Sequence, residues 1–128
     1  MKYLGIDWGT KRIGIAISDT EGRVAFPLTT ISYNKESVAT VYSIAQREEV
    51  KEFVIGESRN FAGEPNAIMA GIEKFKHELE EISGLPVSFE PEFMTSAAAG
   101  REGETSNEKI DASAAALILQ SYIDKNRR

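Results

Sequence analysis

Three acidic residues stand out because each interrupts or borders an apolar segment. Asp7 ends the segment KYLGID at residues 2–7, Glu92 follows LPVSFE, and Asp111 precedes AAALILQSYI. A buried carboxylate is costly unless it is paired or bound to a metal ion. Three carboxylates from separate elements would form an all-oxygen site suited to Mg²⁺ or Mn²⁺. The chemistry that uses such a site is phosphodiester hydrolysis.

Each acid also has an ordinary structural interpretation. Asp7 could accept hydrogen bonds from the backbone of the WGTK turn that follows it. Glu90 is an alternative to Glu92, because spacing alone does not distinguish them, and either could be an exposed glutamate. Asp111 could interact with a helix dipole. Apolar residues follow Asp111 at helical spacing, however, so an inward-facing position favours metal binding.

Residues near Asp7 could bind phosphate. Gly5 and Gly9 flank Asp7 and would allow a phosphate group to approach the backbone closely. Lys11 and Arg12 follow and could meet the phosphate charge, although Lys11 in particular could equally be a solvated surface cation. The chain has no cysteine and one histidine, which excludes Cys–His catalysis and argues against a Ser–His triad.

The elements that would position these residues follow from hydrophobic periodicity. Strands are expected at residues 2–7, 12–18, 24–31, 52–57 and 85–90, and helices at 37–49, 66–83 and 109–125. Hairpin-length links predict an antiparallel meander for the first three strands. Helical connections predict parallel later strands with right-handed crossovers. Pro27 indicates an edge position or a bulge in the third strand, and Gly84 suits a helix end.

We therefore expect an α/β fold with three layers around a mixed five-stranded sheet. A length of 128 residues suits one domain, residues 1–128. The net charge of −5 argues mildly against a sequence-independent nucleic-acid coat, which would need many phosphate contacts from basic residues. The N-terminus lacks the features of a signal peptide, and no apolar run is long enough to span a membrane. A cytoplasmic protein without membrane contact is the expectation.

Four segments resemble the YqgF, or RuvX, family. IDWGTKRIGIAISD (6–19) is similar to the family's opening hairpin, and KIDASAAALILQSYID (109–124) is similar to its final helix. FVIGESRNFAG (53–63) takes the place of a Gly-containing loop, and PEFMTSAAA (91–99) that of an Asp-Glu-Arg-Leu-Thr-type segment. The resemblance spans essentially the whole chain, and its two terminal motifs are specific when taken together.

The resemblance implies an RNase H-like fold and a nuclease. The family is described as Holliday junction resolvases and is linked to maturation of the small-subunit ribosomal RNA precursor. Its three acids fall on Asp7, Glu92 and Asp111, which selects Glu92 over Glu90. The expected partner is an RNA precursor or branched DNA, and the chain is expected to be a monomer or a weak homodimer. Expected nucleic-acid contacts are Gly9, Lys11, Arg12, Arg59, Asn60, Thr95 and Lys109.

The chain departs from the family pattern near the substrate. Pro91 and Phe93 replace the acid and the arginine that usually flank the glutamate, and the segment before Asp111 is less basic than usual. The loop ESRNFAG lacks the usual leucine-proline pair. These changes indicate altered or weakened substrate binding. One alternative is an inactive nucleic-acid-binding module. Another is an actin-like ATPase, which shares the Asp-x-Gly-Thr turn but needs two such domains.

Overall fold

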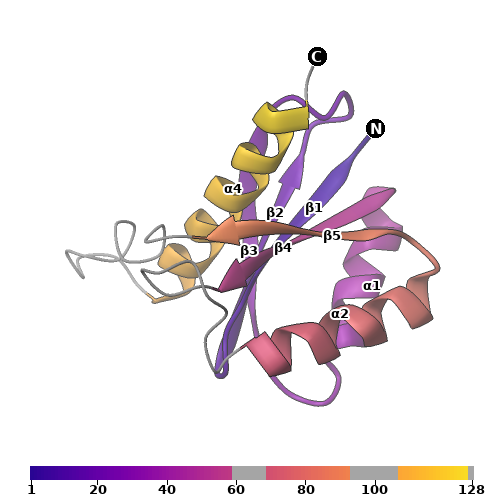
Figure 1. Cartoon of the computed structure of the whole chain (residues 1–128), viewed down its shortest axis with the longest axis vertical. Helices are drawn as coiled ribbons and strands as arrows, with labels where there is room; N and C mark the ends of the chain where they lie inside the picture. The colour runs from indigo at the N-terminus through magenta and orange to yellow at the C-terminus, as the bar shows by residue number, and fades with distance from the viewer. Residues whose placement is uncertain (59–68, 93–106, 127–128) are drawn as a thin grey trace.

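The computed structural model describes residues 1–58, 69–92 and 107–126 (Figure 1). Its strands are β1 (Tyr3–Trp8), β2 (Arg12–Ser18), β3 (Ala25–Ser32), β4 (Glu52–Ser58) and β5 (Val87–Glu92). Its helices are α1 (Ser37–Glu48), α2 (Met69–Ser83) and α4 (Asn107–Asn126). These elements confirm the predicted order of strands and helices, and α4 contains Asp111 in its interior, as expected.

The five strands form one mixed sheet in the order β3-β2-β1-β4-β5. The pairs β1–β2 and β2–β3 are antiparallel, whereas β4 is parallel to β1 and β5 is parallel to β4. The predicted meander and the parallel later strands are therefore confirmed. β1 lies at the centre of the sheet, and β5 lies at one of its edges.

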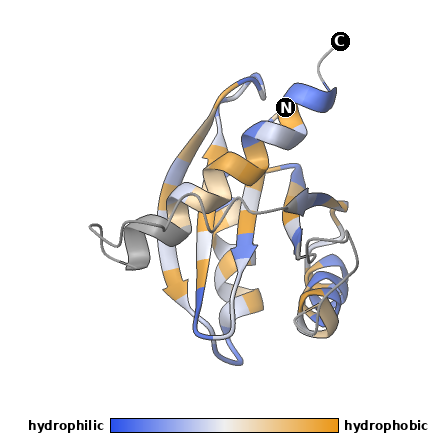
Figure 2. Cartoon of the chain, turned by 60° about the vertical axis from the view of Figure 1, so that its left-hand side comes forward, coloured by the Kyte–Doolittle hydropathy of each residue, from blue (hydrophilic) through white to orange (hydrophobic). Residues whose placement is uncertain are grey.

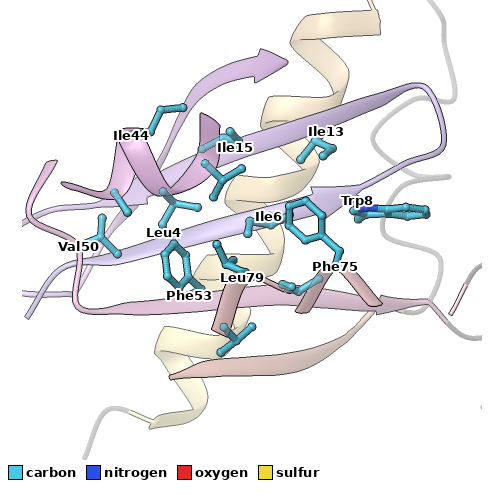
Figure 3. Close-up of a cluster of buried hydrophobic side chains, with 14 of the residues drawn as sticks. Leu4, Ile6, Trp8, Ile13, Ile15, Ile44, Val50, Phe53, Phe75 and Leu79 are labelled. Carbon is cyan, nitrogen blue, oxygen red and sulfur yellow. The ribbon is translucent and has the colours of Figure 1, made fainter. Parts of the chain in front are cut away.

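Helices cover both faces of the sheet, which gives the predicted three layers (Figure 1). One face packs against α1 and α2 through large apolar side chains, several of which are labelled in Figure 3. This core takes every second residue of the central strands, as strand alternation requires. Fully buried members include Leu4, Ile6, Ile13, Ile15, Phe53, Ile55 and Leu79.

The other face packs against α4 and is built from smaller residues. A Cβ atom at Gly5 would lie 2.7 Å from the Leu119 Cβ atom and 3.0 Å from the Ala115 carbonyl oxygen. Glycine is therefore needed at this position because α4 lies directly on the β1 backbone. Figure 2 shows the hydrophobic middle of α4 lying across the sheet, with a hydrophilic turn at its C-terminal end.

Local details also agree with the sequence. Pro27 lies on the edge strand β3, at the irregularity where Ile15 pairs with Thr29 and Ala16 with Pro27. Gly84 has a φ angle of +70° and follows α2, and its N–H donates to the Glu80 carbonyl, so it ends the helix as expected. Within the described ranges, no helix is long and apolar enough to span a membrane.

Two strand boundaries differ from the prediction. β1 continues through Asp7 to Trp8, and β5 runs to Glu92 instead of stopping at residue 90. Glu92 is therefore a strand residue and does not lie in the loop expected after residue 90, whereas Asp7 belongs to its strand as expected. The reason is tertiary: β5 keeps its pairing with β4 up to Ser58, even across Pro91. Pro91 has no N–H to donate, but it belongs to an edge strand, where proline is tolerated.

Candidate metal and nucleic-acid site

Asp7 lies near the carboxyl end of the central strand and belongs to the sheet face covered by α4. Its neighbours Ile6 and Trp8 belong to the core beneath α1 and α2, so alternation places Asp7 on the opposite face, with Gly5. The residue is half-buried. A half-buried carboxylate at the end of parallel strands occupies the location where open α/β sheets bind their ligands.

Gly5 has a different role from the one expected. The sequence suggested that it would open the backbone to a phosphate group, but Leu119 of α4 occupies that space. Gly9 lies in the β1–β2 turn, where a Cβ atom would come within 2.7 Å of the Arg12 carbonyl oxygen. The tight turn alone is thus a sufficient reason for glycine at position 9. The contact with nucleic acid expected for Gly9 stays a prediction.

Glu90 has structural partners, which separates it from Glu92. Its side chain is 4% exposed, and its Oε2 atom accepts a hydrogen bond from the Ser121 hydroxyl at 2.6 Å. The same oxygen lies 2.7 Å from the Lys125 ammonium nitrogen. This carboxylate therefore joins β5 to the C-terminal half of α4. Sequence reasoning missed this role, although the spacing of Ser121 and Lys125, four residues apart on an apolar helix, was a usable signal.

Glu92 continues β5 beyond Glu90, and its backbone pairs in register with Ser58. The pairing of β1 with β4 ends at Ile6 and Ile55, so Asp7 lies one residue beyond it. Because β1, β4 and β5 are mutually parallel, Asp7 and Glu92 approach the same carboxyl edge of the sheet.

The direction of α4 carries Asp111 toward this edge. Gln120 binds the Ala25 N–H and the Arg23 carbonyl, and Tyr122 binds Glu52, so the C-terminal half of α4 lies at the amino ends of β1 and β4. Ala115 lies over Gly5. Asp111 precedes Ala115 by about 6 Å along the helix, and Asp7 follows Gly5 by about 7 Å along the strand. The backbones of Asp7 and Asp111 therefore lie at about the same height along β1.

A polar cluster fixes the opposite end of α4. The Tyr122 hydroxyl donates to Glu52 Oε2 at 2.7 Å and lies 3.3 Å from the Ser88 hydroxyl oxygen. The Ser88 hydroxyl donates to the same Glu52 oxygen at 2.9 Å. Burial raises the pKa of the Tyr122 hydroxyl, and the adjacent Glu52 carboxylate adds to this increase. Together with the Glu90 contacts, this cluster sets the position of α4 on β4 and β5.

The remaining expected contact residues fall into two groups. Lys11 and Arg12 lie in or directly after the β1–β2 turn, at the same edge as Asp7; Lys11 is exposed and Arg12 is half-buried. Lys109 lies in the first turn of α4. Arg59, Asn60 and Thr95 lie outside the described residues. Among the side chains that the structure describes, no three metal-binding groups come together, but Glu92 and Asp111 are not in that set.

The fold is that of the RuvC-type resolvases, which are RNase H-like. The structure is similar to RuvC of Thermus thermophilus, with a TM-score of 0.63 and 16% identity over 98% of this chain and 95% of that one. It is also similar to the fowlpox virus Holliday junction resolvase, with a TM-score of 0.58 and 16% identity over 98% of this chain and 99% of that one. At this level of identity the likeness establishes the fold.

The sequence identifies the family within that fold. A family model described as "RuvX: Holliday junction resolvase" matches residues 1–125. A protein of Moorella thermoacetica is 37% identical over 98% of this chain and 96% of its own length. A protein of Chloroflexus aggregans is 36% identical over 97% of this chain and 94% of its own length. Both are named "Putative pre-16S rRNA nuclease". The chain belongs to the RuvX family.

Proposed function

We propose that this protein, as a single domain, is a divalent-metal-dependent nuclease that processes a ribosomal RNA precursor. The observation that carries the proposal is the arrangement of the three acids. Asp7, Glu92 and Asp111 come from a central strand, an edge strand and a helix, and their backbones approach one edge of the sheet. The names of the relatives support a nuclease acting on RNA.

The residues present fit a hard metal ion. An all-carboxylate set suits Mg²⁺ or Mn²⁺, and the chain has neither cysteine nor a histidine near these acids. Asp7, Glu92 and Asp111 would hold the ion. When bound, it would supply a water nucleophile at neutral pH and offset the charge of the phosphate.

The remaining work is binding and positioning by the chain itself. Lys11 and Arg12 lie at the same edge of the sheet as Asp7, where they would hold phosphates of the substrate. The contact of α4 with Gly5, and the Glu90 contacts with Ser121 and Lys125, would fix the distance of Asp111 from the two strand acids. Glu90 would serve as a positioning residue that does not touch the substrate.

The test is cleavage of labelled substrates by wild type and Asp7→Asn, with Mg²⁺ or Mn²⁺ and with EDTA. The substrates are a precursor ribosomal RNA fragment, duplex DNA and a four-way DNA junction. We expect wild type to cut the RNA, and we expect Asp7→Asn to lower the cleavage rate more than about a hundredfold. Removing even a hydrogen-bond partner of a metal ligand lowers metal affinity or activity about 10- to 100-fold. EDTA should abolish cleavage.

A matched control is Asp19→Asn, in the turn between β2 and β3. The Arg23 and Val24 N–H groups donate to Asp19 Oδ1, an acceptor that asparagine retains. This variant should cut like wild type. Preferred cutting of the junction would select the resolvase activity that the family description gives. No cleavage by folded wild type with either metal would refute the nuclease, and retained binding by Asp7→Asn would then indicate a binding module.

A further inference from the structure

Several basic side chains that the structure describes in this acidic protein are paired with acids of the same chain. Among the described residues, ion pairs join Lys2 and Arg47 to Glu48, Arg23 to Glu21, Lys76 to Glu80 and Lys125 to Glu90. Within the same part of the chain, the lysines that make no ion pair are Lys11, Lys35, Lys51 and Lys74. A nucleic-acid site needs such uncompensated cations.

Three of these lysines gather at the end of β1 that carries Asp7. The Lys11 carbonyl accepts a hydrogen bond from the Tyr33 N–H at 2.9 Å, so the β1–β2 turn lies against the segment that follows β3. Lys35 belongs to that segment, and it lines a hollow of about 260 Å³ together with Tyr33 and Lys74 of α2. Lys51, in contrast, directly precedes β4, at the amino end of the sheet.

Tyr33 presents an exposed aromatic ring at this hollow. Its side chain is 42% exposed, and its ring meets the Trp8 ring edge-to-face, with centroids 5.2 Å apart. Trp8 directly follows Asp7 and lies at one end of the buried cluster, near Phe75 (Figure 3). Phe75 and Gly71 of α2 also line the hollow, and Gly71 contacts the Trp8 ring. Tyr33 is thus supported on one side by the core.

The segment carrying Tyr33 and Lys35 is held in place before any ligand binds. The Ser37 hydroxyl accepts a hydrogen bond from the Asn34 N–H at 2.7 Å and donates to the Ser32 carbonyl at 3.1 Å. The Asn34 side-chain oxygen accepts from the Glu36 N–H at 2.8 Å. A ligand would therefore lose little free energy in ordering this segment.

An exposed aromatic ring among unpaired lysines is the arrangement by which proteins bind single-stranded nucleic acid. A base stacks on the ring while the cations follow the phosphates. A base within a duplex has both faces stacked on its neighbours, so it cannot use such a ring without leaving the helix. Glu78 also lines the hollow and opposes the two lysines there, so the lining keeps a net positive charge of one.

We propose that the hollow formed by Tyr33, Lys35 and Lys74 binds an unpaired nucleotide of the strand that reaches Asp7. The base stacks on Tyr33, while the phosphates contact Lys35 and Lys74. Lys11 contacts the nucleic-acid backbone between the hollow and Asp7. This inference rests on the proposed nuclease function for its substrate, but binding can be measured without cleavage.

The experiment measures binding of a labelled single-stranded RNA and of the matching duplex by fluorescence anisotropy, in the full-length Asp7→Asn background at several salt concentrations. The double variant Lys35→Ala/Lys74→Ala should weaken single-strand binding at least about tenfold. It should also reduce the slope of log K against log salt by about 1.4, because each lost phosphate contact removes about 0.7. The matched control Lys51→Ala should bind like the parent.

The aromatic contact has its own matched pair. Tyr33→Ala should weaken binding about 5- to 150-fold, which corresponds to the loss of one stacked base, while Tyr33→Phe should bind like the parent. Neither change should alter duplex binding. Glu78→Gln should strengthen single-strand binding, because it removes the opposing charge. Circular dichroism and thermal unfolding establish that each variant is folded.

The outcomes separate the hollow from the nuclease. The hollow is refuted if Lys35→Ala/Lys74→Ala binds like Lys51→Ala and Tyr33→Ala binds like Tyr33→Phe, even when the protein with Asp7 intact cuts RNA. It is also refuted if no single-stranded RNA binds. If the variants weaken binding as expected but the protein with Asp7 intact cuts no substrate, the binding role of the hollow is supported and the nuclease proposal fails.

Discussion

The two faces of the sheet are packed in different ways. The face beneath α1 and α2 is a conventional apolar core, with Phe53, Ile55 and Leu79 among its fully buried members. The face beneath α4 has a glycine at its centre and buried or half-buried polar contacts at its rim, including those of Glu90 and Glu52. One face uses large side chains to gain stability. The other uses small ones to bring a helix close to β1.

The α1/α2 face mainly stabilises the fold, whereas the α4 face positions the candidate acids. Asp7 belongs to the sheet face covered by α4 and lies two residues from Gly5, and Asp111 belongs to α4 itself. Close approach of α4 sets the spacing between Asp111 and the strand acids. Damage to the first face should therefore reduce stability, whereas a small displacement of α4 should reduce activity more than stability.

The largest effect on stability is expected from Phe53→Ala. Phe53 is fully buried, so its removal leaves a cavity and should cost about 3–5 kcal/mol of unfolding free energy, as measured by denaturant titration. The matched control is Phe26→Ala, since Phe26 is 50% exposed on the edge strand and should change stability by less than about 0.5 kcal/mol. Equal costs at the two positions would contradict the assignment of the core.

Gly5→Ala tests the α4 face directly. The added methyl group would overlap Leu119 and the Ala115 carbonyl, and it should cost about 1–3 kcal/mol. Because α4 must move away from β1, cleavage per folded molecule should fall at least about tenfold, comparable to a loss of positioning. Denaturant titration and cleavage of the RNA precursor are measured on the same sample. Unchanged cleavage by a folded variant would show that the position of α4 does not matter.

Lys125→Ala tests the polar contact between α4 and β5. It leaves the buried Glu90 carboxylate with only Ser121 as a described partner, but Lys125 is itself 59% exposed, so the cost should be about 1–2 kcal/mol. The same change in a Glu90→Gln background should cost less, which a double-mutant cycle of unfolding free energies measures. If Lys125→Ala lowers the unfolding free energy equally in both backgrounds, Lys125 and Glu90 do not stabilise each other.

The smallest effect is expected at Tyr122. Tyr122→Phe removes one hydrogen bond to Glu52, which keeps the Ser88 donor, so the cost should be about 1 kcal/mol. The folded pKa of Tyr122 is raised, so folding favours its protonated form. Stability from this group is complete below the unfolded value near 10 and declines as the pH rises toward the folded pKa. Tyr122→Phe should remove part of this decline, which denaturant titration at several pH values measures.

The sequence by itself determined the elements and their connectivity. The alternation of Ile13, Ile15 and Ile17 marked a strand, short links set the meander, and helical links made β4 and β5 parallel to β1. These features are local, because periodicity and loop length act over a few residues. The sequence also placed Asp111 inside a helix, because the helical periodicity predicted an element over residues 109–125.

Only the tertiary structure decided which polar residues have structural partners. Glu90 and Glu92 look alike along the chain, and the contacts of Glu90 with Ser121 and Lys125 join residues about thirty positions apart. Gly5 looked like a site for phosphate until α4 was found above it. Lys35 and Lys74 are separated by β4 in sequence, yet they line one hollow with Tyr33. Such contacts depend on how elements pack, and packing is not encoded in local spacing.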